Sequence, residues 1–87
     1  FDLTIVPIGA YLPREMMKSS HCTPEEAVLI TKMLKSKNII GMHWGTIRLS
    51  AEDPWDPPRK FINAAKQKGY HDNNIWKMAI GETRSLI

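Results

Sequence analysis

The sequence predicts an α/β domain, because short apolar runs rich in β-branched residues alternate with two segments that carry helix-start signals. Three of these runs are expected to be strands, with a helix before the second and the third, in the order β-loop-α-β-loop-α-β. This alternation is typical of helices packed on a layer of strands. The 87 residues make one small domain at most, so residues 1–87 are expected to form one unit with no internal boundary.

The three expected strands are short. The first covers residues 3–8, and Pro7 places either its end or a sheet edge there, because proline donates no ladder hydrogen bond. The second covers residues 38–42 and leads directly into His43. The third covers residues 75–80.

The first helix has the clearest start signal in the chain. Thr23 is expected to cap it, Pro24 suits the first helical position, and Glu26 completes a capping box. Apolar residues at helical spacing predict the side that faces the core, which comprises Ala27, Ile30 and Leu34, with Val28 and Met33 on its flanks.

The second helix is expected to begin at Asp56 as its cap, before Pro57 and Pro58, and to stop at Gly69. Its expected inward side chains are Phe61, Ile62 and Ala65. Residues 10–22 and 44–56 are then long loops, and loops of this length in compact domains are often functional.

Composition excludes several classes of protein. The net charge of +3 is mild and the twelve Lys and Arg are scattered, so a nucleic-acid partner is not expected. The single cysteine, Cys22, cannot form an internal disulfide. No run approaches the ~20 apolar residues of a membrane span. Because the chain starts at Phe1 without a methionine or a basic leader, we expect it to be part of a longer protein.

Three histidines are the candidate metal or acid/base residues. His43 follows a strand, at the sheet edge where α/β proteins usually bind ligands. His-x-His and His-x-x-x-His spacings are absent, so spacing alone favours a structural role for His43. His21 lies in the first long loop and can reach the same edge, whereas His71 lies in a polar turn and is expected to be solvated. Convergence of His21 and His43 would provide a ligand and a second acid/base or orienting group.

Other reactive side chains have simpler interpretations. Cys22 lacks the glycine turn or helix start that would activate a thiol, which disfavours a nucleophilic role. The carboxylates of the second loop are expected to form turns and caps, with metal or acid/base duty as the lesser alternative; they are Glu52, Asp53 and Asp56. Tryptophans 44, 55 and 76 either pack in the core or line an apolar mouth, and core packing is favoured for Trp76 on its strand.

Three motifs in fixed order resemble one family closely. They are Val-Pro-Ile-Gly-Ala-Tyr-x-Pro-Arg from Val6, Met-Lys-x-x-His-x-x-Pro-Glu-Glu-Ala-Val from Met17, and His-Trp-Gly-Thr from His43. The family is the N-acylphosphatidylethanolamine-hydrolysing phospholipase D group of the metallo-β-lactamase superfamily. The resemblance implies a four-layer αββα sandwich, of which this chain would be the C-terminal part.

The resemblance also implies a function. Family members bind two zinc ions and cleave the lipid phosphodiester to give an N-acylethanolamine and phosphatidic acid. His43 would be the last zinc ligand of the set and His21 the catalytic, substrate-binding histidine near the phosphate. The other ligands would lie upstream of this chain, which would therefore be inactive alone.

The implied partners are a phospholipid substrate, a peripheral membrane surface and a second copy in a homodimer, with an intracellular location, peripheral to a membrane or cytoplasmic. Two alternatives stay open. One is another phosphodiesterase or lactonase of the same superfamily, and the other is a catalytically dead, truncated scaffold.

Overall fold

Three parallel strands form one sheet in the order β1-β2-β3 in the computed structural model, which describes residues 1–17, 21–45, 52–79 and 81–86. The strands are β1 (Leu3–Pro7), β2 (Asn38–Met42) and β3 (Ile75–Trp76). Ile40 pairs with Ile5 on one side and with Trp76 on the other. The α/β prediction is confirmed, and β2 has the predicted bounds.

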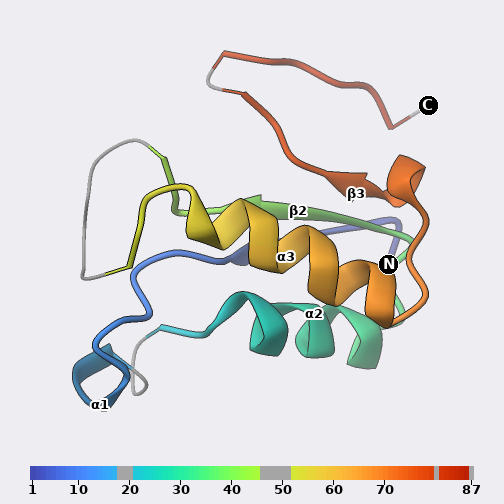
Figure 1. Cartoon of the computed structure of the whole chain (residues 1–87). Helices are drawn as coiled ribbons and strands as arrows, with labels where there is room; N and C mark the ends of the chain where they lie inside the picture. The colour runs from blue at the N-terminus through green and yellow to red at the C-terminus, as the bar shows by residue number, and fades with distance from the viewer. Residues whose placement is uncertain (18–20, 46–51, 80, 87) are drawn as a thin grey trace.

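Two crossover helices connect these strands. Helix α2 (Pro24–Met33) joins β1 to β2, and α3 (Asp56–Gln67) joins β2 to β3. Crossovers between parallel strands are almost always right-handed, so an unreversed strand order places both helices on the same face of the sheet. Figure 1 shows α2 and α3 on one side of the strands.

The two faces of the sheet differ in burial because side chains alternate along each strand. Val6, Ile39 and Ile75 are at most 8% exposed and pack in one cluster with side chains of both helices. The other face is more open on β1 and at the end of β2, where Ile5 is 54% and Met42 is 45% exposed, although Trp76 on the same face is only 9% exposed. The hydrophobic core therefore lies between the sheet and the helices, and much of the second face of the sheet is uncovered.

The predicted cap of α2 is confirmed. The Thr23 hydroxyl accepts a hydrogen bond from the Glu26 N–H (3.2 Å), and the Glu26 carboxylate accepts one from the Thr23 N–H (2.8 Å). The prediction of its buried side was wrong for Ile30 and Leu34, which are 44% and 40% exposed. The buried residues are Pro24, Ala27, Val28 and Thr31. Thr31 can be buried because its hydroxyl donates to the Val28 carbonyl oxygen (2.7 Å).

Helix α2 ends without a glycine. Lys35 adopts φ +55°, and its N–H donates to the Lys32 carbonyl while the next N–H, from Ser36, donates to Thr31. These two hydrogen bonds form a Schellman motif, in which glycine usually occupies the left-handed position. Lysine at this position therefore carries backbone strain.

The predicted cap of α3 was wrong. Trp55 occupies the cap position without a side-chain hydrogen bond, and Asp56 is the first helical residue. The Asp53 carboxylate already accepts the Trp55 N–H (2.8 Å), while the Asp56 carboxylate accepts a hydrogen bond from Tyr11 (3.1 Å). The inward side is as predicted, with Phe61 and Ala65 buried and Ile62 partly buried, and Gly69 adopts φ +94° just after the helix.

Two loop predictions also need correction. The first long loop contains a short helix, α1 (Arg14–Met17), and a single 3₁₀ turn, η1 (Asp72–Asn74), precedes β3. Strand β3 stops at Trp76 instead of residue 80, which lies outside the described residues. After Trp76, the Ala79 N–H donates to the Glu82 carboxylate, and the Glu82 N–H donates to the Ala79 carbonyl oxygen. These backbone groups are therefore not available to extend β3.

Among the described residues, none of the helices has the length and the apolar composition that a membrane span requires.

Candidate functional site

His43 is held at the carboxyl end of β2 by an unusually close backbone contact. The Ile8 N–H donates to the Met42 carbonyl oxygen (2.9 Å), which ties the segment after β1 to the end of β2. A Cβ atom at Gly9 would lie 1.9 Å from the His43 carbonyl oxygen, so only glycine fits there. His43 has φ +67°, a left-handed conformation rare outside glycine and typical of functional sites. Its side chain is exposed.

A buried carboxylate fixes the loop that follows Gly9. Glu52 is 8% exposed, and its two oxygens accept hydrogen bonds from the N–H groups of Ala10 (2.5 Å) and Leu12 (3.0 Å). Glu52 therefore orders backbone 40 residues away in the sequence, beside the segment that contacts His43. A glutamate in a long loop carries no sequence signal of such a contact.

The position of His21 is fixed through a hydrogen bond to its main chain. Arg14 donates to the His21 carbonyl oxygen (3.1 Å) and pairs with the Glu26 carboxylate (2.6 Å) at the start of α2. The neighbouring Cys22 thiol donates to the Pro7 carbonyl oxygen (3.3 Å). Burial raises the pKa of Cys22, which keeps the thiol protonated and argues against a nucleophilic role, in line with the sequence analysis.

The structure brings His21 and His43 together. Their rings lie parallel, with centroids 5.3 Å apart and planes 2° from each other, and His21 is half-buried. The sequence left open whether these two histidines converge, and the structure places their rings side by side; the role of each histidine remains a prediction. Two adjacent imidazoles can supply a metal-binding nitrogen and an N–H group that donates a hydrogen bond to a bound anion. His71 precedes η1 and β3, so it lies at the opposite edge of the sheet, where it is exposed.

The donor set fits part of a metal site. Zinc takes about four ligands, of which at least three come from the protein. No three His, Cys, Asp or Glu side chains gather around one point in the part of the chain that the structure describes. His43 has the properties of a single ligand, because its exposed imidazole stands on a backbone fixed by β2 and Gly9. Any zinc at this edge would take its remaining ligands from outside the described residues.

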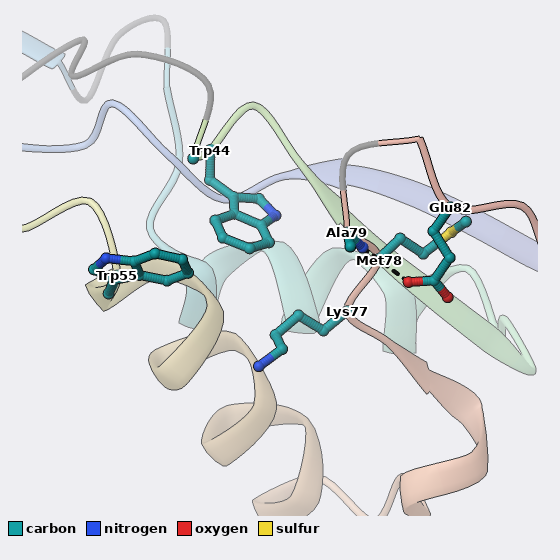
Figure 2. A pocket seen from close by; sticks show the side chains of 7 residues that line it. Trp44, Trp55, Lys77, Met78, Ala79 and Glu82 are labelled. Carbon is teal, nitrogen blue, oxygen red and sulfur yellow. Dashed lines mark hydrogen bonds between the residues drawn. The ribbon is translucent and has the colours of Figure 1, made fainter.

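A pocket of about 320 Å³ is lined in part by Trp44 and Gly45, the two residues that follow His43 in the sequence (Figure 2). Trp44 and Trp55 form an edge-to-face pair, with centroids 6.1 Å apart and planes at 61°. The lining residues are Trp44, Gly45, Trp55, Lys77, Met78, Ala79 and Glu82. Trp44 and Trp55 thus line an apolar mouth, whereas Trp76 is 9% exposed and belongs to the core, as favoured from the sequence.

Comparison with known proteins agrees with the resemblance of the motifs. Residues 1–44 match the family model described as the beta-lactamase superfamily domain. The chain is 48% identical over 59 residues to N-acyl-phosphatidylethanolamine-hydrolyzing phospholipase D 1 of Caenorhabditis elegans, covering 68% of this chain and 17% of the relative. It is 37% identical over 70 residues to the mitochondrial N-acyl-phosphatidylethanolamine-hydrolyzing phospholipase D of Saccharomyces cerevisiae, covering 80% and 15%.

An uncharacterized protein of Mycobacterium tuberculosis is 41% identical over 70 residues, covering 77% of this chain and 18% of the relative. The chain thus spans about a sixth of the length of the curated relatives that it matches. The family model covers Gly9 together with His21 and His43, the two histidines whose rings meet at the carboxyl end of β2. This chain therefore belongs to the beta-lactamase superfamily.

Proposed function

We propose that this chain is the C-terminal part of a zinc-dependent phosphodiesterase that hydrolyses N-acylphosphatidylethanolamine to N-acylethanolamine and phosphatidic acid, and that it is inactive alone. The observation that carries the proposal is the His21–His43 pair at the carboxyl edge of the sheet. Relatives named as hydrolases of this lipid support the choice of substrate.

The uncovered face of the sheet supports the four-layer αββα arrangement. Both crossover helices lie on one face, and Ile5 and Met42 leave apolar surface exposed on the other. A sheet that is apolar on both faces needs a second layer there, because exposed contiguous apolar surface favours burial. A second sheet of the full-length protein would supply that layer, and its loops would bring further ligands to the edge at His43.

In the proposed reaction, His43 would hold zinc through one imidazole nitrogen. Bound zinc would lower the pKa of a water molecule and polarise the phosphodiester oxygens. His21 would hydrogen-bond a phosphate oxygen or assist the leaving group, which requires an imidazole beside the ligand edge. Glu52 and Gly9 would keep the two loops in place without contacting the lipid.

The outer side of α2 supports a peripheral membrane location as part of the same proposal. Four apolar side chains are at least 40% exposed there, namely Leu29, Ile30, Met33 and Leu34. Exposed Lys32, Lys35 and Lys37 lie next to them in the sequence. An apolar helix side beside lysines complements an anionic bilayer surface. The variant Met33→Glu should reduce the fraction of protein that sediments with anionic vesicles. If Met33→Glu instead loses self-association and still binds vesicles, this side of α2 is the interface of a homodimer.

The decisive experiment measures the substrate of the full-length protein. Purified protein with its zinc content determined should release N-acylethanolamine from N-acylphosphatidylethanolamine in mixed micelles, and chelation should abolish the activity. A sugar lactone tested in parallel addresses the alternative that the protein is another phosphodiesterase or lactonase of the same superfamily. Lactone hydrolysis without lipid hydrolysis would replace the proposed substrate, and inactivity on both with zinc bound would favour a scaffold.

A further inference from the structure

The guanidinium group of Arg14 holds the chain at His21 through two contacts. Its Nη1 donates to the His21 carbonyl oxygen (3.1 Å), and its Nη2 pairs with the Glu26 carboxylate (2.6 Å). The same carboxylate oxygen of Glu26 accepts the Thr23 N–H (2.8 Å), so the guanidinium is anchored on the capping box of α2. Because a guanidinium is planar and presents its N–H groups in a rigid fork, the two contacts fix the main chain of His21 relative to the start of α2.

The residue after His21 is fixed at the end of β1. The Cys22 thiol donates to the Pro7 carbonyl oxygen (3.3 Å), and Pro7 pairs in the sheet with Met42, the residue before His43. The chain at His21 is therefore tied both to the start of α2 and to the strand ends beside His43. The parallel imidazoles, with centroids 5.3 Å apart, thus depend on main-chain contacts that lie outside both rings.

One segment, residues 9–14, touches the main chain of both histidines. At its start, Gly9 packs so closely against the His43 carbonyl oxygen that a Cβ would not fit, and at its end Arg14 donates to the His21 carbonyl oxygen. The backbone between these two ends donates two hydrogen bonds to a buried carboxylate. Arg14 therefore stands at the end of a segment whose position relative to His43 is already fixed.

We infer that Arg14 is a positioning residue, which sets the distance and the angle between the His21 imidazole and His43 without contacting the substrate. Its consequence for catalysis rests on the proposed function, in which His21 acts on the phosphate. A shift of about 1 Å in such a group typically costs about 100-fold in rate. Lysine at this position would keep the charge but not the fork, so it would not hold both acceptors in the same geometry.

The first test measures the position of His21 without substrate. Full-length, zinc-loaded protein with ¹³C-labelled histidine rings is studied by NMR, and the His21 signal is identified as the one that His21→Ala lacks. Because neighbouring rings shift each other's C–H resonances, Arg14→Lys and Arg14→Ala should both move this signal. Arg59→Lys is the matched control and should leave it in place, since the ion pairs of Arg59 with Asp53 (4.0 Å) and Asp56 (3.6 Å) can also be made by lysine.

A double-mutant cycle then tests whether Arg14 acts through His21. In the folded full-length protein, Arg14→Ala should keep zinc and lower kcat by about 100-fold, and Arg14→Lys should lower it roughly tenfold. In the His21→Ala background, Arg14→Ala should cost less than about twofold, because the group that it positions has already been removed. A role in stability alone would instead give the same fold-loss in both backgrounds.

Three results would overturn the inference. The first is a His21 ring signal that stays in place in both Arg14 variants, with folding verified by circular dichroism. The second is an equal displacement of that signal by Arg59→Lys, and the third is additive losses of kcat in the cycle. Because the ring signal requires no turnover, it decides the positioning role even for a protein that does not hydrolyse the lipid, which would refute the proposed function alone.

Discussion

Gly9→Ala tests whether the close backbone contact at the end of β2 sets the position of His43. An alanine Cβ would lie 1.9 Å from the His43 carbonyl oxygen, while real Cβ atoms essentially never approach within 3.0 Å. The two segments must therefore separate by roughly 1 Å. They cannot do so freely, because the Ile8–Met42 hydrogen bond joins them next to the contact.

The cost of this separation has two parts. Overpacking of a well-packed site costs about 1–3 kcal/mol, and loss of the Ile8–Met42 hydrogen bond would add about 1 kcal/mol. We therefore expect Gly9→Ala to lower the free energy of unfolding by roughly 2–4 kcal/mol. A shift of about 1 Å in a catalytic group typically costs about 100-fold in rate, so kcat/KM of the folded full-length protein should fall to that extent.

The assay combines denaturant unfolding, zinc content and kcat/KM corrected for the folded fraction, all on the full-length protein. Gly69→Ala is the control: Gly69 has φ +94° and open space around its Cα, at the end of α3 away from His43. It should lose about 1 kcal/mol of stability through backbone strain while keeping full specific activity. Unchanged zinc content and kcat/KM in Gly9→Ala would refute the positioning role of Gly9.

The remaining predictions concern the histidines, the end of α2 and a buried tyrosine. In the full-length protein, His43→Ala should lose zinc together with activity, whereas His21→Ala should keep zinc and lose about 100-fold in kcat; full zinc occupancy in His43→Ala, measured by elemental analysis, would exclude the ligand role. Lys35→Gly should stabilise the protein by about 0.5–1 kcal/mol in denaturant unfolding, because relief of the left-handed strain at φ +55° (about 1–2 kcal/mol) exceeds the extra unfolded-chain entropy of glycine (about 0.4–1 kcal/mol); lower stability would show that Lys35 carries no such strain. Burial, then the hydrogen bond to Asp56, raise the pKa of Tyr11 above its ordinary value of 10.0. The folded protein thus holds the phenol proton more tightly than the unfolded chain, so this contribution is complete below pH 10 and decreases as pH rises above it. Unfolding free energies from pH 8 to 11 should therefore show a smaller difference between wild type and Tyr11→Phe as pH rises, and a constant difference would show that the phenol is not involved.

The sequence by itself determined the features that depend on neighbouring residues. The capping box at Thr23, the end of β2 before His43 and the helix stop at Gly69 were all predicted, because dihedral preferences and capping hydrogen bonds act within about four residues. The motifs around His21 and His43 likewise indicated the superfamily that the family model then identified. Strand lengths were less predictable, since the hydrogen bonds that end β3 involve Glu82 beyond it.

Only the tertiary structure decided which distant residues meet. The ring pairing of His21 and His43 spans 22 positions, and the Glu52 contacts with Ala10 and Leu12 span 42 and 40. Such contacts depend on how the crossovers close onto the sheet, which local preferences do not specify. The same holds for the buried side of α2, where hydrophobicity pointed to Ile30 but the packing against the sheet selected Thr31. Apolar spacing indicates that a helix has a buried side; the neighbouring elements determine which side it is.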